Sequence, residues 1–214
     1  MRILIVAATL QEVAFLENEL KRKTHKNEIL FCITGVGIVP TVYVLTKYLA
    51  FDNKFDLILN LGIAGAIDST LKIGEVLEVC CDSFYDWGAE DNFNFLSVFD
   101  LGFLSKNESP FVNGKLFSTY NSKFLLKKVN SITVQLVHGN AKSIEKLLHS
   151  DNKAELESME GAAVYYVSNQ YKLPVMQMRA ISNYVEPRNR DKWNIELAIN
   201  NLNAKALDFL NSIP

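Results

Sequence analysis

The sequence predicts an α/β fold: a three-layer α/β/α sandwich around a central, mixed and mostly parallel sheet. Apolar runs of strand length alternate with longer helical patterns along the whole chain. One run, residues 56–61 (DLILNL), is almost continuously apolar, which is typical of strands buried on both faces of a sheet. No repeat, low-complexity tract or linker interrupts the alternation, so we expect one domain over residues 1–214.

The first strand and the first helix are expected near the N-terminus. Residues 2–8 (RILIVAA) form a largely apolar run that ends before Gln11 and Glu12. A signal peptide would stay apolar up to a small-residue cleavage site, so we expect a buried strand instead. Residues 11–21 repeat apolar side chains at helical spacing, which predicts an amphipathic helix. Further strands are expected at residues 29–34, 56–61, 74–81, 132–137 and 175–182, and further helices at residues 41–49, 143–149, 161–170 and 193–210.

Small and irregular segments connect these elements. Residues 35–37 (GVG) indicate a tight turn, and residues 62–66 (GIAGA) indicate a loop after the buried strand. Residues 84–114 mix Asp, Asn, Gly and many aromatics, so we expect a long excursion over the surface. Ligands of such folds bind at the carboxyl ends of the strands. The candidate segments are therefore residues 9–12, 35–37, 62–66, 138–140, 158–160 and 182–190.

The glycine turn at residues 35–37 also suggests a dinucleotide site, because it follows a strand and opens a helix. That fingerprint requires a third glycine three residues after the second, and this position holds Pro40. A tight turn is therefore favoured over a dinucleotide site, and we expect no cofactor.

Composition excludes several classes of protein. The chain has 22 Lys and Arg against 24 Asp and Glu, a formal net charge of -2, whereas nucleic-acid binders usually carry a basic excess. No apolar run approaches the roughly 18 residues that a membrane span needs. Three cysteines, an odd number, fit a reducing compartment, so we expect a cytoplasmic protein. The three histidines are scattered, so we expect no metal site.

Three separated segments carry a family resemblance. They are residues 60–66 (NLGIAGA), 157–163 (ESMEGAA) and 179–183 (RAISN). In this order and spacing the chain resembles the superfamily of purine nucleoside phosphorylases and methylthioadenosine/adenosylhomocysteine nucleosidases, which splits purine N-ribosides. The resemblance implies that fold, a small-molecule purine nucleoside as substrate and a homo-oligomer, whose contact the aromatic-rich residues 84–103 could supply.

Two further stretches narrow the resemblance to the futalosine hydrolases of that superfamily. They are residues 86–91 (DWGAED) and 182–193 (SNYVEPRNRDKW). The methylthioadenosine nucleosidases usually place Asp where this chain has Asn183, whereas Tyr184 stands where the hydrolases often carry Arg. The resemblance implies that the chain releases hypoxanthine from futalosine, a reaction of an alternative menaquinone pathway.

The resemblance also assigns roles at the sugar. Glu12 would activate the attacking water as a general base. Glu160 would bind the ribose hydroxyls and stabilise a sugar with oxocarbenium character, beside Ser158 and Met159 in the same segment. The alternative for each carboxylate is an ordinary acidic residue at a helix N-terminus, and for Met159 a core position.

At the base, Ala64 and Gly65 would line the ring and allow close approach. The Asn183 amide can donate to O6 and accept from a protonated N7, which suits hypoxanthine, whereas Asp would suit adenine. The alternative is an Asn that caps a turn. Arg188 or Arg190 would pair with the benzoate of the futalosine side arm, because a guanidinium fork fits a carboxylate. A solvated turn is the alternative there.

The loop after the first strand indicates which nucleophile attacks the sugar. Phosphorylases of the superfamily carry a GDP-x-R phosphate loop there, whereas residues 8–12 (ATLQE) contain neither glycine nor arginine. A phosphate dianion would meet Glu12 and no cation, so water is the expected nucleophile. The alternatives are a methylthioadenosine, adenosylhomocysteine or aminodeoxyfutalosine nucleosidase, a purine nucleoside phosphorylase, and a binding protein without turnover.

Overall fold

The computed structural model describes residues 1–22, 25–92, 94–150 and 152–213, and no helix in them is long and apolar enough to cross a membrane. The helices are α1 (Leu10–Arg22), α2 (Ile38–Phe51), α3 (Ala141–Leu148), α4 (Gly161–Gln170), the 3-10 turn η1 (Arg190–Lys192) and α5 (Ile195–Ser212). The strands are β1 (Arg2–Ala7), β2 (Glu28–Ile33), β3 (Leu57–Ala66), β4 (Val76–Phe84), β5 (Gly88–Asp91), β6 (Asn94–Ser97), β7 (Leu116–Phe117), β8 (Lys128–Thr133), β9 (Leu156–Ser158) and β10 (Val175–Tyr184).

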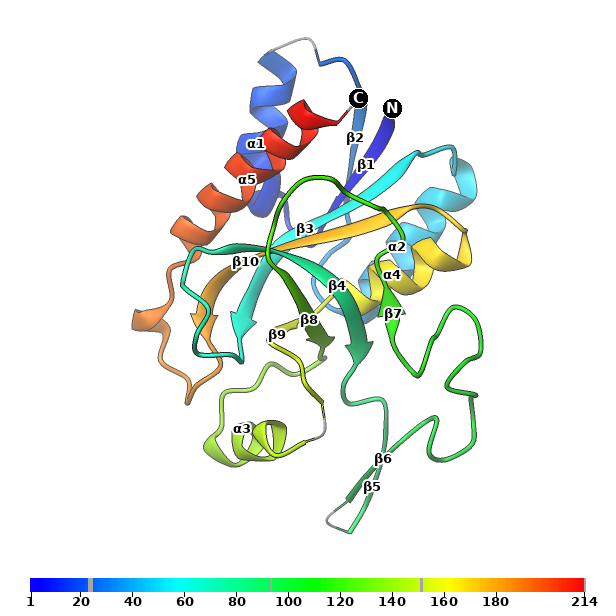
Figure 1. The fold of residues 1–214 in the computed structure, drawn as a ribbon, viewed down its shortest axis with the longest axis vertical. Coiled ribbons are helices and arrows are strands. Elements are labelled where there is room, and N and C mark those ends of the chain that lie inside the picture. The colour runs from blue at the N-terminus through cyan, green and yellow to red at the C-terminus, as the bar shows by residue number, and fades with distance from the viewer. Residues whose placement is uncertain (23–24, 93, 151, 214) are drawn as a thin grey trace.

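Two pairs of helices cover the two faces of the sheet, as predicted. Figure 1 shows α1 beside α5 and α2 beside α4. Along β1 the side chains alternate: Ile3 and Ile5 belong to the core under α1 and α5, and Leu4 and Val6 to the core under α2 and α4. All four are at most 1% exposed. Because a strand presents successive side chains to opposite faces, a run that is apolar at every position requires cover on both sides. The predicted α/β class is therefore confirmed.

The main sheet closes on itself, which the sequence did not predict. Its strands follow the order β10-β4-β8-β9-β3-β1-β2, and β10 pairs with β3 as well. Strands β3, β9, β8, β4 and β10 thus form a ring, and β1 and β2 continue from β3. The pairs β10–β4, β3–β9 and β4–β7 are antiparallel, and the other main-sheet pairs are parallel.

Three predicted elements differ from the structure. Residues 62–66 are not a loop, because β3 continues through Ala66 between β10 and β9. The strand expected at residues 132–137 is β8 at Lys128–Thr133, whose first half is polar, and Leu136 beyond it is 80% exposed. Strand β9 was missed because it is three residues long. In each case pairing with distant strands outweighs the local pattern.

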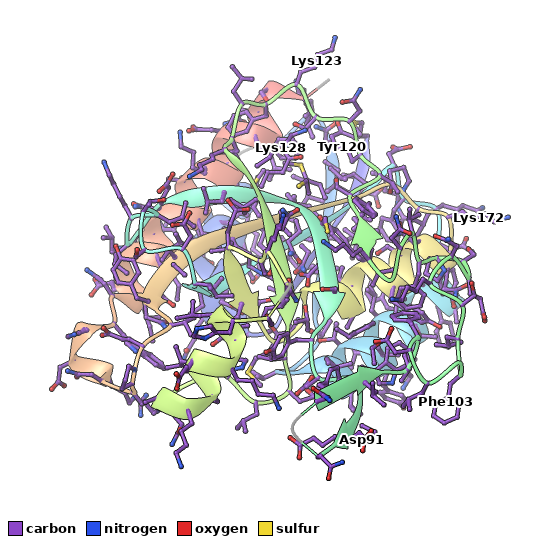
Figure 2. The ribbon with its side chains drawn as sticks, turned by 60° about the horizontal axis from the view of Figure 1, so that its bottom comes forward. Asp91, Phe103, Tyr120, Lys123, Lys128 and Lys172 are labelled. Carbon is purple, nitrogen blue, oxygen red and sulfur yellow. The ribbon has the colours of Figure 1, made fainter. Side chains whose placement is uncertain are left out.

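The stretch at residues 84–114 runs over the surface but contains a hairpin, β5–β6, which projects below the sheet in Figure 1. Figure 2 shows Phe103 on the outside of the molecule, where its side chain is 74% exposed. Edge-to-face contacts tie the base of the excursion to α4. They join the rings of Phe84, Trp87, Phe99, Phe111 and Tyr166.

Candidate active site

A cavity of about 410 Å³ lies at the carboxyl ends of β1, β3 and β10. Its lining includes every predicted site residue except Arg190. These are Glu12, Ala64, Gly65, Ser158, Met159, Glu160, Asn183 and Arg188. The fold thus gathers five separate segments of the chain around one space. Thr9, Val36 and His138, which also line it, lie in the candidate segments after strands but were given no role, and Glu157, Trp193, Ile195 and Ile199 lie outside those segments.

Glu12 lies in the first turn of α1 with its carboxylate held on two sides. Oε2 accepts hydrogen bonds from the Thr9 backbone N–H at 2.9 Å and the Thr9 hydroxyl at 3.1 Å, and Oε1 accepts from the Ile63 N–H at 3.3 Å. In Thr9-x-x-Glu12 the carboxylate thus makes the Glu half of a capping box at the start of α1, whereas the Thr9 hydroxyl donates to the carboxylate and does not cap the helix. The helix-start interpretation is correct, yet the same carboxylate also lines the cavity and is 8% exposed.

Glu160 occupies the N-cap of α4 but does not cap it. Its Oε1 accepts a hydrogen bond of 2.8 Å from the backbone N–H of Gly37, the residue before α2. The Ser158 and Thr133 hydroxyls accept the N–H groups of the first helical turn instead. Burial raises the pKa of Glu160, and the nearby Arg179 guanidinium opposes that rise. The Glu160 carboxylate is therefore desolvated in the site and does not serve as a helix cap.

Arg179 is fully buried beside both carboxylates. A Cβ at Gly62 would overlap its guanidinium and would lie 3.1 Å from Glu12 Oε1, so glycine at this position leaves room for the two groups. Arg179 Nη2 donates to Gln177 Oε1 at 3.3 Å. The guanidinium offsets the negative charge that would otherwise accumulate in a site with two carboxylates.

A buried polar network continues from Gln177 away from the cavity. Gln177 accepts a hydrogen bond from the Asn60 amide at 2.8 Å and donates to Asp82 at 3.0 Å. Asp82 also accepts from the Thr133 hydroxyl, which binds the N-terminus of α4. Burial raises the pKa of Asp82 to about 6. In the sequence, the indication of this network is Asn60, a polar side chain inside the apolar run DLILNL.

Asn183, Gly65 and Glu157 form a row across three strands at one end of the cavity. Asn183 pairs with Gly65 after a bulge in β10, and Gly65 pairs with Glu157 on β9. Paired residues present their side chains on the same face of a sheet. A Cβ at Gly65 would lie 3.3 Å from Asn183 Nδ2 and 3.5 Å from Glu157 Cγ. Val185 Cγ2 would lie closer still, at 3.1 Å, so glycine at this position leaves room for these three side chains.

The Asn183 amide is oriented by its neighbours. Its Oδ1 accepts a hydrogen bond of 2.8 Å from the Ser182 hydroxyl, and its Nδ2 donates to the Tyr184 carbonyl at 3.0 Å. An amide oxygen has two lone pairs and an amide nitrogen has two hydrogens. One acceptor site and one donor hydrogen therefore remain for a ligand.

His138 and Glu157 form a buried pair that the sequence did not suggest. His138 Nδ1 lies 2.6 Å from Glu157 Oε2, and the His138 backbone N–H donates to Glu157 Oε1 at 3.1 Å. The side chains are 9% and 4% exposed. Counting the histidines as scattered missed this pair, because its members come together only through the pairing of β8, β9 and β3.

The two arginines after β10 have different positions. Arg188 lines the cavity, whereas Arg190 lies in η1 and is not part of the lining, so the structure does not bring both predicted cations to the site. Both guanidinium groups pack over the Trp193 ring, at 5.0 and 5.8 Å from its centroid. Both arginines are exposed, so only the contact with the cavity distinguishes them.

The lining offers little to a phosphate or a metal ion. Among the described residues that line it, Arg188 is the sole Lys or Arg, and it lies after β10 rather than beside β1. The described part of the chain contains no group of three or more His, Cys, Asp or Glu side chains suited to a metal ion.

Comparisons with known proteins show the family to which the chain is related. The family model described as Phosphorylase superfamily matches residues 2–211. Futalosine hydrolase of Streptomyces coelicolor is 30% identical over 151 residues, which cover 70% of this chain and 63% of that protein. The 5'-methylthioadenosine/S-adenosylhomocysteine nucleosidase of Buchnera aphidicola is 25% identical over 99% of this chain and 90% of its own length.

Solved structures resemble the fold over the whole chain. The same type of nucleosidase from Neisseria meningitidis, in complex with methylthio-immucillin-A, has a TM-score of 0.81 at 14% identity, over 99% of each chain. Futalosine hydrolase of Helicobacter pylori has a TM-score of 0.80 at 16% identity, over 100% of this chain and 98% of that one.

Proposed function

The chain belongs to the phosphorylase superfamily, and from this premise we propose that it is an N-glycosyl hydrolase that releases hypoxanthine from futalosine. One observation carries the proposal: the fold brings two carboxylates and one amide, Glu12, Glu160 and Asn183, to the lining of one cavity. Membership of the family and its nucleosidase relatives support cleavage at the sugar–purine bond. The residues of the cavity then indicate the nucleophile and the base.

Water is the nucleophile in this proposal. The loop after β1 presents the Glu12 carboxylate to the cavity where a phosphate would need a cation. Glu12 takes a proton from water as the water oxygen bonds to the anomeric carbon. The bond from that carbon to N9 breaks, and its electron pair leaves with the purine. The sugar passes through an oxocarbenium-like state, which the negative charge of Glu160 stabilises.

Asn183 supports hypoxanthine as the leaving base. Its free amide hydrogen can donate to O6, and the free lone pair of Oδ1 can accept from a protonated N7. An Asp here would lack the donor to O6. N7 takes its proton from solvent water, because the Asn183 amide cannot supply one, and Glu12 returns its proton to solvent after the step. The purine then departs as a neutral base, and the contact to Asn183 stabilises its N7–H form. Ala64 and Gly65 line this end with small residues that allow the ring to approach the backbone.

A base-release assay tests the proposal. We expect the protein to release hypoxanthine from futalosine in phosphate-free buffer and to release little adenine from methylthioadenosine. Inosine serves as the 6-oxopurine nucleoside without the side arm. Release that requires phosphate would make the protein a phosphorylase, and turnover of none of the three substrates would support a binding protein instead.

A second candidate is a nucleosidase for methylthioadenosine and adenosylhomocysteine. The observation that favours it is the extent of similarity to such enzymes, over 99% of the chain in sequence and in fold. Asn183 opposes it, because N7 and the 6-amino group of adenine are better served by a carboxylate. The same assay distinguishes the two candidates by the identity of the released base.

Arg188 and Arg190 serve as test and control for a contact with the side arm of the substrate. We expect Arg188→Ala to raise KM for futalosine about tenfold, since a charge-assisted hydrogen bond to the benzoate would be lost. Arg190→Ala should change KM less than twofold, because Arg190 lies outside the lining. KM for inosine, which lacks the benzoate, should stay the same in both variants. An unchanged KM for futalosine in Arg188→Ala would contradict the assignment.

A further inference from the structure

The reaction described above leaves one buried pair without a role, His138 and Glu157. Both line the cavity, and Glu157 is the third member of the row with Asn183 and Gly65. A purine whose O6 and N7 contact Asn183 would lie over Gly65, with the next atoms of its ring toward Glu157 and His138. The next edge position after C6 in a purine is N1.

Both oxygens of Glu157 are engaged by His138. Oε1 accepts from the His138 backbone N–H, and Oε2 lies 2.6 Å from Nδ1. An ionised carboxylate can only accept hydrogen bonds, so Nδ1 carries a proton. In a neutral imidazole the other nitrogen, Nε2, is then an acceptor. No described residue forms a hydrogen bond with Nε2, so it is the ring nitrogen left for a ligand, and the His138 ring lines both this cavity and the neighbouring one beside Tyr85 and His149.

A hydrogen-bond acceptor at N1 distinguishes the two kinds of purine. A 6-oxopurine carries a hydrogen on N1, whereas a 6-aminopurine has a lone pair there. We propose that His138, oriented by Glu157, is a specificity-determining residue that accepts the N1–H of a 6-oxopurine and disfavours 6-aminopurines. This inference rests on the proposed function, because it concerns the base of the same substrate. Asn183 and His138 together would contact N7, O6 and N1.

The substitution Glu157→Gln tests this directly, because it should reverse the tautomer of His138. The backbone N–H of His138 can only donate, so the amide oxygen must face it. The amide NH₂ then faces Nδ1, which has to accept, and the ring hydrogen moves to Nε2. Nε2 becomes a donor, which fits N1 of a 6-aminopurine and not the N1–H of a 6-oxopurine.

The expected result is a change in selectivity. The ratio of kcat/KM for futalosine to that for aminodeoxyfutalosine, its 6-amino counterpart, should fall about 10- to 100-fold in Glu157→Gln. His138→Phe keeps a ring but removes the acceptor, so this ratio should fall about tenfold without reversal of the preference. Glu145→Gln, an exposed change on α3, is the matched control and should leave the ratio unchanged. A general loss of stability would lower both rates and leave their ratio intact.

Binding of the free bases separates this inference from the proposed function. Calorimetry should show that the unmodified protein binds hypoxanthine more tightly than adenine, and that Glu157→Gln reverses the order. This result would support the role of His138 even if futalosine is not hydrolysed. Equal binding of the two bases, or a selectivity ratio within threefold of the unmodified value in both variants, would overturn it.

Discussion

Glu12→Gln is expected to lower kcat for base release about 10²- to 10⁴-fold, the range that general bases contribute. The amide cannot take a proton from water. Its oxygen can still accept from Thr9, so this contact and the start of α1 should survive. KM should change little, because the carboxylate acts on water rather than on the substrate. Steady-state kinetics with futalosine measure both constants.

A control on the same helix separates chemistry from folding. Glu17 forms an exposed ion pair with Lys21 and does not line the cavity, so Glu17→Gln should keep kcat within twofold. Thermal melting should place both variants within a few degrees of the unmodified protein. Retention of kcat within threefold in Glu12→Gln would remove Glu12 from the mechanism and leave it as a helix cap.

Glu160→Gln is expected to lower kcat/KM about 10²- to 10³-fold, as removal of one electrostatic contact to a transition state typically does. The amide keeps an acceptor for the Gly37 N–H but loses the charge that faces the ribosyl cation. The loss should appear in kcat as well as in KM, since the charge matters more as the sugar becomes positive. Glu108→Gln, an exposed substitution with no resolved contact to the cavity, is the control.

The pH profile offers a second measurement for Glu160. Only the ionised carboxylate stabilises the cation, so activity should fall as the pH drops through its pKa. Burial raises that pKa, which places the acid limb of kcat/KM at a higher pH than an ordinary glutamate would. In Glu160→Gln this contribution to the limb should disappear. An acid limb that is identical in both proteins would assign the titration to another group.

Much of the fold was predictable because burial leaves a local signal. The helix expected at residues 161–170 has the same bounds as α4, and the strand expected from residue 175 is β10 with two more residues. Both segments are mostly apolar and largely buried between other elements. The bounds were less accurate where polar residues occupy buried strand positions, as Ser131 and Thr133 do in β8.

The candidate site was predictable in its residues more than in its arrangement. Short motifs after strands indicated Glu12, Glu160 and Asn183, and the fold brings all three to one cavity. Arg188 and Arg190 look equivalent in the sequence and both pack on the Trp193 ring, yet only Arg188 lines the cavity. Arg190 belongs to the three-residue turn η1, and the spacing of apolar residues in the sequence does not predict that turn.

The sequence by itself determined the α/β class, most of the alternation of strands and helices and the residues of the candidate site, because these depend on apolar spacing and on local motifs. The tertiary structure alone decided the closure of the sheet and the row of Asn183, Gly65 and Glu157, which are far apart in the chain. Strand partners and register are fixed by hydrogen bonds between distant segments, and these have no periodic signature in the sequence. For that reason the sequence placed His138 in a candidate segment and Glu157 in a motif without indicating that the two form a pair.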